Sequence, residues 1–258
     1  MKALSVVVVF LLLLLATVAL VAMDSLKPQP VAVGCGSVIT TDTTLSKNIG
    51  PCSGNGLVIG HNDITLNCAG GTISGTRTND TGVGIRLAGM TRVTVENCNV
   101  TGFQNGILLS NSSINTLANN TASANGDDGF VLASCFHDTL RENTANGNDA
   151  YSNSTYYNTN YNSQDGFYLN SSTSNTLTEN TASSNIRGFV ISDSSDNTLT
   201  GNTADNNSGS GFRFSGSSGN TLTGNTSDNN TKDGFVLQDF ANNNKLTGNT
   251  ASSNWDGL

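Results

Sequence analysis

The sequence predicts an all-β protein that winds as a right-handed parallel β-helix of about eight coils, each of 22–23 residues. Two observations predict this fold: a motif that recurs at a nearly constant spacing, and an alternation with period two inside each repeat. The composition is a third observation in its favour. Only 12% of the 258 residues are charged and 36% are hydrophobic, which disfavours helices packed around a conventional core.

The recurring motif is a glycine followed by a large apolar residue. Gly-Phe pairs begin at Gly166, Gly188, Gly211 and Gly234, at intervals of 22, 23 and 23 residues. Two further markers, Asn-Thr-Leu and Asn-Thr-Ala, recur in the same register. Extending this register towards the N-terminus finds the earlier pairs Gly56-Leu57, Gly84-Ile85, Gly106-Ile107 and Gly129-Phe130.

Each repeat predicts three short strands with one apolar side. In the unit after Gly188, alternation places Phe189, Ile191, Leu199 and Ala204 on the same side. Such strands bury that side if each stacks on its counterpart one coil earlier, at ~4.8 Å spacing. Right-handed winding follows from the usual chirality of parallel connections. One asparagine column is expected to form an internal ladder: Asn120, Asn143, Asn180, Asn202, Asn225 and Asn249.

The repeat Asn-Thr-Leu-Thr-Gly-Asn-Thr-Ala, followed by Gly-Phe, covers about 84–258 and resembles the β-helix repeats of NosD-like proteins. The stretches Gly56–Ile59, Ile64–Asn67 and Thr72–Gly75 are similar to the first coils of such chains. The resemblance implies a pectate-lyase-like fold in the carbohydrate-binding and sugar-hydrolysis class. It also raises a periplasmic, copper-related role, although two His and three Met make poor copper ligands.

The N-terminus predicts export. Lys2 precedes the apolar run Val6–Leu15 and small residues follow it, so 1–23 is expected to be a signal peptide. An uncleaved membrane anchor is the alternative. Residues 24–34 are then a tether and 35–258 the β-helix, in which 35–83 form an N-terminal cap with the first coils and 84–258 the regular repeats. The protein is expected to be secreted, extracellular or periplasmic.

Export also makes the five cysteines informative, because disulfides form in oxidising compartments. Cys35 and Cys52 bracket a compact Gly- and Pro-containing stretch and are expected to form a disulfide. Cys68 and Cys98 pair if their coils stack. Cys135 is then a free thiol.

Two repeats carry extra residues, at about 76–81 and 146–163, both between the Ala strand and the Gly-Phe strand. Insertions in solenoids commonly map to one binding face. We expect sugar rings to stack on the tyrosines in and beside the second insertion, with Arg86 as a polar contact. These tyrosines are Tyr151, Tyr156, Tyr157, Tyr161 and Tyr168. The structural alternative is that they cover an outward apolar stripe at Leu108, Val131 and Val190.

Catalysis on this fold requires clustered carboxylates, in some cases with calcium. The candidates are Asp127 and Asp128, with His137 and Arg141 one turn later. Aspartate before the repeat glycine is also ordinary turn chemistry. The sequence therefore favours binding of extracellular polysaccharide or surface partners without catalysis, and a polysaccharide lyase, hydrolase or epimerase is the alternative.

The remaining features concern partners. A formal charge of −8 argues against nucleic acid and anionic lipid. Thr-x-Thr triplets at 176–178, 198–200 and 221–223 resemble the ice-binding faces of insect antifreeze proteins, although Thr is also a favoured strand residue. The sequence stops at Gly257-Leu258, where a further coil is due. This predicts either a truncated reading frame or end-to-end self-association.

Overall fold

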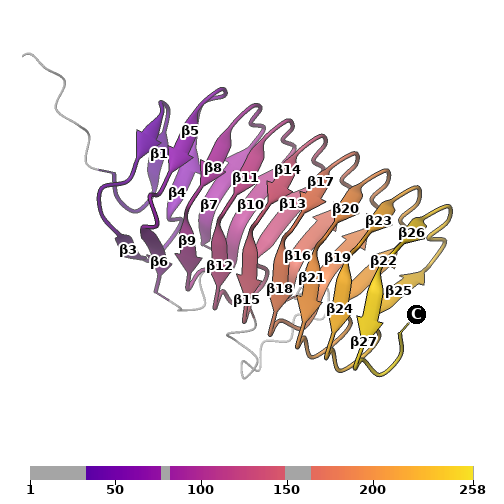
Figure 1. The fold of residues 1–258 in the computed structure, drawn as a ribbon. Coiled ribbons are helices and arrows are strands. Elements are labelled where there is room, and N and C mark those ends of the chain that lie inside the picture. Colours follow the sequence, from indigo (N-terminus) through magenta and orange to yellow (C-terminus); the bar gives the residue numbers. More distant parts are fainter. Residues whose placement is uncertain (1–32, 77–81, 149–163, 258) are drawn as a thin grey trace, which may run out of the picture. The chain divides into compact units, whose positions relative to one another are not determined.

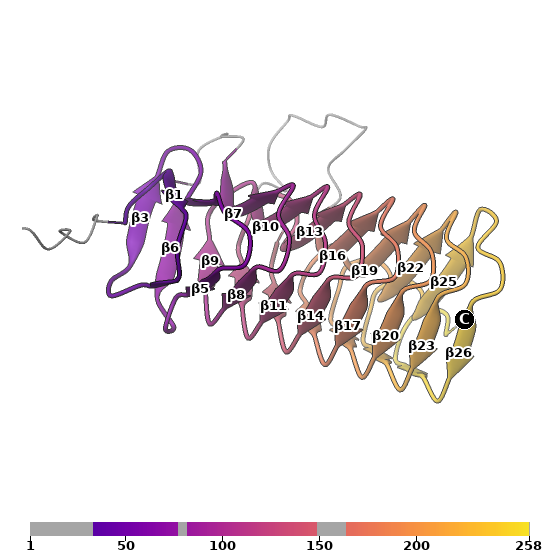
Figure 2. The same ribbon diagram turned by 90° about the horizontal axis from the view of Figure 1, so that it is seen from above.

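A computed structural model describes residues 33–76, 82–148 and 164–257, which lie within one compact unit, Val33–Leu258. These residues form 27 strands and no helix, arranged as three parallel sheets of nine strands (Figures 1 and 2). Each coil contributes one strand to each sheet, as predicted. The expected signal peptide or anchor at 1–23 lies outside the described residues. Within the described part, no helix is long and apolar enough to span a membrane.

We call the sheets A, B and C in the order in which a coil visits them. Sheet A contains β1 (Ser37–Ile39), β4 (Leu57–Ile59), β7 (Val83–Ala88), β10 (Asn105–Ser110), β13 (Phe130–Ala133), β16 (Asp165–Asn170), β19 (Arg187–Ser192), β22 (Phe212–Ser215) and β25 (Phe235–Gln238). Sheet B contains β2 (Thr43–Thr44), β5 (Thr65–Asn67), β8 (Thr94–Glu96), β11 (Thr116–Ala118), β14 (Thr139–Arg141), β17 (Thr176–Thr178), β20 (Thr198–Thr200), β23 (Thr221–Thr223) and β26 (Lys245–Thr247).

Sheet C contains β3 (Ile49–Cys52), β6 (Thr72–Gly75), β9 (Asn99–Thr101), β12 (Thr121–Ser123), β15 (Thr144–Asn146), β18 (Thr181–Ser183), β21 (Thr203–Asp205), β24 (Thr226–Asp228) and β27 (Thr250–Ser252). Nine coils therefore replace the predicted eight. The difference arises at the N-terminus, where 37–52 form a complete coil although this segment lacks the Gly-Phe, Asn-Thr-Leu and Asn-Thr-Ala markers.

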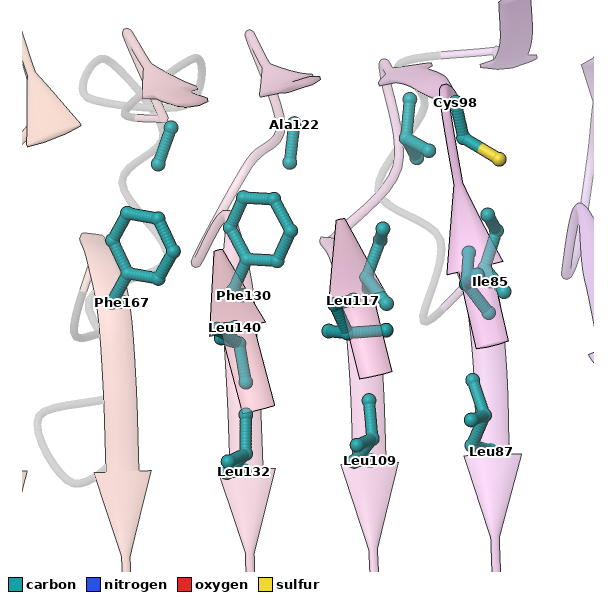
Figure 3. Close-up of a cluster of buried hydrophobic side chains, with 14 of the residues drawn as sticks. Ile85, Leu87, Cys98, Leu109, Leu117, Ala122, Phe130, Leu132, Leu140 and Phe167 are labelled. Carbon is teal, nitrogen blue, oxygen red and sulfur yellow. The ribbon is translucent and has the colours of Figure 1, made fainter. Parts of the chain in front are cut away.

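The core is a continuous interior file of stacked side chains. Neighbouring rings are 4.7–4.8 Å apart between centroids, within 8° of parallel, and buried; they belong to Phe130, Phe167, Phe189, Phe212 and Phe235. Leucine from sheet B and alanine from sheet C complete the interior (Figure 3). The predicted aromatic and aliphatic spine is confirmed.

The repeat glycine is explained by the tight corner between sheets C and A. A Cβ added at Gly166 would lie 2.7 Å from the Cβ of Ala182 and 2.7 Å from the carbonyl oxygen of Gly188. No side chain fits in that space without moving backbone. Glycine before phenylalanine therefore lets the chain pass close to the Ala strand while Phe fills the interior.

Asparagine ladders stabilise the turns. The main-chain N–H and Nδ2 of Asn180 donate to Oδ1 of Asn202 at 3.0 and 2.9 Å, and Nδ2 also donates to the carbonyl of Leu140 at 2.9 Å. Three such ladders run along the β-helix, whereas the sequence predicted one. The predicted file starts at Asn120, and the two further files start at Asn115 and Asn125. They satisfy polar groups that the stacked turns bury.

A fourth file in the turn between sheets A and B consists of serines, and Cys135 occupies one of its places. Ser172 Oγ accepts from the Cys135 main-chain N–H at 3.0 Å and donates to the carbonyl of Asn170, while Cys135 Sγ contacts the carbonyl of Ala133 in the equivalent way. Burial raises the pKa of the Cys135 thiol to about 12. Cys135 is free, as predicted, and it packs as a serine substitute.

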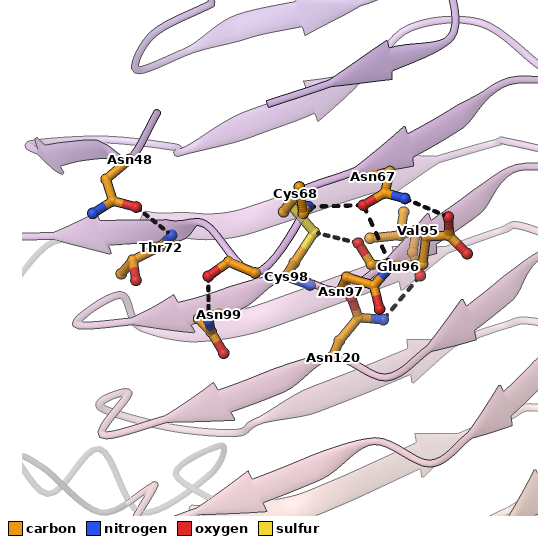
Figure 4. Close-up of a disulfide and its surroundings, with 12 residues drawn as sticks. Asn48, Asn67, Cys68, Thr72, Val95, Glu96, Asn97, Cys98, Asn99 and Asn120 are labelled. Carbon is orange, nitrogen blue, oxygen red and sulfur yellow. Dashed lines mark hydrogen bonds between the residues drawn. A yellow bond between two sulfur atoms is a disulfide. The ribbon is translucent and has the colours of Figure 1, made fainter. Parts of the chain in front are cut away.

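Both predicted disulfides are present. Cys35–Cys52 spans 17 residues, and Cys68–Cys98 joins two successive coils with their Cα atoms 4.7 Å apart (Figure 4). Two disulfides in one chain are typical of proteins that fold outside the reducing cytosol.

Candidate functional site

The outer face of sheet A carries a file of large side chains. The strand register aligns Arg86, Leu108, Val131, Tyr168, Val190 and Arg213, which we call the sheet A file. Five strand steps separate its ends, or ~24 Å. The same register continues beyond both arginines, to Val58 before Arg86 and to Val236 after Arg213. The two arginines therefore flank an aromatic and aliphatic segment of a longer row.

Tyr168 is the fourth of the six residues of the sheet A file and its only aromatic one. It is half-buried between Val131 and Val190, which are only 8% and 5% exposed although both point outward. The pKa of the Tyr168 hydroxyl is raised, mainly by burial and further by the charges of Asp128 and Asp165. The hydroxyl therefore stays protonated near neutral pH and can donate a hydrogen bond.

Acidic residues line the corner where sheet A begins. Asp128 Oδ1 accepts from the main-chain N–H of Asp165 at 2.7 Å, and Asp127 Oδ1 accepts from that of Gln164 at 3.2 Å. Asp127 and Asp128 are 9% and 3% exposed. These bonds extend the ladder pattern of the asparagines. Such bonds are the ordinary role of aspartate in a turn, which the sequence analysis gave as the alternative to catalysis.

Asp165 is fully buried and forms an ion pair. Its Oδ1 and Oδ2 accept from Nε and Nη2 of Arg187 at 2.7 and 3.1 Å. Burial raises the pKa of Asp165 to about 7, against the opposing attraction of Arg187. A raised carboxyl pKa is typical of catalytic acids, but a general acid must also reach its substrate. Because Asp165 is inaccessible, we assign the pair to stabilisation of this corner.

The sequence missed the Asp165–Arg187 pair, although it contains a signal for it. The position before the repeat glycine is aspartate at 128, 165, 233 and 256, and arginine at 187. Stacked repeats place residues of this column in adjacent coils. Residues of opposite charge at successive places in one column therefore predict an ion pair between neighbouring coils.

The structure separates the four candidate catalytic residues into two groups. Asp127 and Asp128 precede β13, whereas His137 and Arg141 follow it in the next turn and in sheet B. The four residues of β13 alone span ~13 Å. His137 is exposed, and Arg141 pairs with Glu142 at 3.0 Å. The two groups lie at opposite ends of a strand because a coil changes direction at each corner.

The four insertion tyrosines, Tyr151, Tyr156, Tyr157 and Tyr161, lie outside the described residues. The ends of the insertions are described: the first joins β6 to β7 and the second joins β15 to β16. Both leave sheet C and enter sheet A, three coils apart, as predicted. The second re-enters at Gln164, beside Asp165 and Tyr168.

The described residues do not fit a copper site or a carboxylate calcium site. None of them form a group of three or more His, Cys, Asp or Glu able to hold a metal. Four cysteines are in disulfides, and the pKa of the fifth is raised by burial. His61 and His137 occupy turns three coils apart, roughly 14 Å by strand spacing.

Comparisons with known proteins agree with this architecture. The family model described as right handed beta helix region matches residues 150–258, and the model of the periplasmic copper-binding protein NosD matches 29–154. No curated protein matches the chain in sequence.

Similar solved structures include the periplasmic alginate epimerase AlgG, with 16% identity, a TM-score of 0.63 and coverage of 76% of this chain and 47% of AlgG. The Dettilon tailspike protein has 15% identity, a TM-score of 0.63 and coverage of 85% and 53%. Pectate lyase Pel9A has 17% identity, a TM-score of 0.57 and coverage of 86% and 60%. The chain thus spans about half the length of these proteins, and the likeness shows the fold. The chain is a right-handed parallel β-helix repeat protein with a pectate-lyase-like fold, similar to NosD over residues 29–154.

Proposed function

We propose that this protein binds an acidic polysaccharide outside the cytoplasm, on the outer face of sheet A, without catalysing a reaction. The sheet A file carries the proposal. The chain carries a formal charge of −8, but Arg86 and Arg213 place two guanidinium groups suited to carboxylates on this face, one on each side of the apolar segment. Tyr168 provides a flat ring and a hydroxyl between them, a combination suited to a sugar. The insertion that carries four further tyrosines joins sheet A at this level.

The carboxylates beside the file support binding in preference to catalysis. Asp128 and Asp165 are bound to main-chain N–H or to Arg187, and both are buried. A group held in this way cannot reach a sugar to exchange a proton with it. The two disulfides support a location outside the cytoplasm.

Replacing Arg86 and Arg213 by Gln tests the proposal. We expect wild-type protein to be retarded in native gels that contain alginate or pectate, and not in gels with neutral xylan. Each substitution is expected to weaken retention at least about tenfold, because a hydrogen bond to a charged group contributes about 1.5–3 kcal/mol. Arg141→Gln makes the same change on sheet B and should have no effect. Equal retention of all variants would contradict the proposal, as would shortened or epimerised polysaccharide.

The tyrosines need a separate measurement, because the structural alternative assigns them to cover of the apolar stripe. Tyr156→Ala and Tyr157→Ala should abolish retention and leave the melting temperature unchanged if these side chains bind sugar. A large fall in melting temperature with retention intact would mean that these tyrosines cover Val131 and Val190 and do not bind sugar. Tyr168→Phe is the matched control for the hydroxyl alone.

The threonine register favours a second candidate function, binding to ice. Seven threonines of sheet B align in one outward file: Thr65, Thr94, Thr116, Thr139, Thr176, Thr198 and Thr221. The sequence analysis identified three Thr-x-Thr triplets, and the structure extends their first threonine to a file of seven. It repeats a hydroxyl and a methyl group at ~4.8 Å.

A nanolitre osmometer measurement decides this second candidate. Ice binding predicts thermal hysteresis that is lost in Thr198→Lys, because a lysine in the middle of the file interrupts the repeat. Ser192→Lys places the same side chain on sheet A and should leave the hysteresis unchanged. The absence of hysteresis in wild-type protein would eliminate this function.

A further inference from the structure

We infer a second carbohydrate site, independent of the first, in a shallow, open pocket at the edge between sheets B and C, lined mainly by asparagines. The pocket has a volume of about 450 Å³ and is lined by Asn67, Ala69, Gly70, Asn97, Asn99 and Asn119. None of these lining residues is charged. We assign it to a neutral sugar unit of an oligosaccharide, because amide groups recognise hydroxyls without requiring a charge.

The pocket exists because one turn is longer than its neighbours. Four residues separate β5 from β6, whereas two residues separate β8 from β9 in the next coil. The two extra residues place Ala69 and Gly70 beside that coil. Gly70 N–H donates to the carbonyl of Asn97 at 2.8 Å, and Asn99 Nδ2 donates to the carbonyl of Gly70 at 2.7 Å.

The Cys68–Cys98 disulfide fixes this longer turn to the coil that it contacts (Figure 4). Cys68 directly precedes Ala69, and Cys98 lies between Asn97 and Asn99. The disulfide therefore holds both sides of the pocket in place. Preorganisation of this kind reduces the entropy lost when a ligand binds.

The amides in the pocket are also held in position. Asn67 Nδ2 donates to Oε1 of Glu96 at 2.7 Å, and Asn67 Oδ1 accepts from Nδ2 of Asn97 at 3.3 Å. These bonds and the Asn99–Gly70 bond fix the nitrogen ends of the Asn67, Asn97 and Asn99 amides. In the part of the chain that the structure describes, Oδ1 of Asn97, Oδ1 of Asn99 and the amide of Asn119 have no protein partner.

The free groups match the hydroxyls of a sugar. Two fixed oxygens can accept hydrogen bonds, and Asn119, which is exposed, offers both an acceptor and two donors. Later coils lack this set. The positions equivalent to Asn97 and Asn119 are Glu142 and Glu179 and then glycine at 201, 224 and 248. The amide cluster is therefore confined to the longer turn and is not a general property of the repeat.

The later coils also supply a variant that should fold. Asn97 and Asn119 have φ of 56° and 53°, and later coils have glycine there. Thr72 and Thr121 flank Asn99 in its file. Asn97→Gly with Asn99→Thr and Asn119→Gly therefore removes the three amides and keeps residues that the fold already uses at these places. Asn206→Gly with Asn229→Gly is the matched control at the edge between sheets C and A, where both residues have positive φ.

Titration with neutral cello-, malto- and manno-oligosaccharides, followed by NMR or calorimetry, tests the inference. Wild-type protein and the control should bind at least one of these probes. The triple variant should still unfold cooperatively, with at most a small fall in melting temperature from the loss of the Asn97–Asn67 and Asn99–Gly70 bonds. It should bind the probe about tenfold or more weakly, as the loss of several ligand hydrogen bonds of about 0.5–1.5 kcal/mol each predicts. Failure of wild-type protein to bind any probe, or equal affinity of the triple variant, would overturn it.

The two proposed sites can be distinguished. Arg86→Gln and Arg213→Gln should leave neutral oligosaccharide binding intact, and the triple amide variant should retain its alginate or pectate retardation. If the neutral oligosaccharide is lost only in the arginine variants, the second site is refuted while the first stands.

Discussion

Replacing Asp138 by Asn is expected to raise the free energy of unfolding by about 1–3 kcal/mol at about pH 8. Asp138 occupies a place that asparagine fills in the other described members of its ladder. Its Oδ1 accepts from Nδ2 of Asn115 at 2.9 Å, and its N–H donates to Oδ1 of Asn175 at 2.8 Å. Its Oδ2 is buried and makes no hydrogen bond of normal geometry, although the Cys135 thiol lies close enough to interact with the carboxyl. Asparagine would place a donating Nδ2 at that position.

The gain should depend on pH. Burial raises the pKa of Asp138 to about 6 in the folded protein, above its ordinary value of 3.8. The folded state therefore binds the proton more tightly than the unfolded state. The stabilisation by this proton is complete below about pH 4 and is lost as the pH rises through about 6. The advantage of Asp138→Asn should grow over that range.

Urea unfolding of wild-type protein and Asp138→Asn between about pH 4 and 8 measures this effect. The difference in unfolding free energy between the two proteins should increase with pH and then level off. The reverse change in the same file, Asn175→Asp, should lower the free energy of unfolding, and the decrease should also grow with pH. A variant that is less stable than wild type at about pH 8, or a difference independent of pH, would refute the role assigned to Asp138.

Replacing Arg187 by Met is expected to destabilise the protein by about 3–5 kcal/mol at about pH 8, because it leaves the buried Asp165 carboxylate without its partner. Asp165→Asn combined with Arg187→Met should recover most of this loss, since no charge then remains buried. Arg141→Met is the matched control. It breaks the exposed Arg141–Glu142 pair, and exposed pairs contribute about 0–1 kcal/mol.

The cost of Arg187→Met should also be smaller at low pH. The pKa of Asp165 is raised to about 7 with Arg187 present, and Arg187 lowers it. Removing Arg187 raises the pKa further, so the carboxyl is neutral at about pH 5 and its burial costs less. Chemical unfolding at about pH 5 and 8 tests this. An equal loss at both values, or a double variant as unstable as the single, would contradict the assignment.

The fold could be predicted because the repeat determines which residues meet. The spacing of Gly-Phe pairs places Phe130, Phe167 and Phe189 in one file whatever the details of the turns, and the structure confirms that file. Cys68 and Cys98 pair for the same reason. The first coil was harder to predict, because Ser37–Cys52 lacks the repeat motifs that identify the other coils.

The candidate site was less predictable, because it depends on corners and on single departures from the repeat. His137 follows Asp128 closely in sequence, but β13 lies between them. Arg187 and Asp138 each replace the usual residue of a column, and the effect of such a change depends on burial. Asp165 is fully buried although it precedes a glycine in a turn motif, which from sequence alone suggests an exposed position.

A crystal structure with an oligosaccharide from the retained acidic polysaccharide tests the central claim most directly. Binding on the outer face of sheet A predicts an unmodified sugar chain along that face, with a ring against Tyr168 and carboxylates at Arg86 or Arg213. An oligosaccharide bound on another face with the sheet A file unoccupied, or a cleaved or epimerised product, would contradict the account.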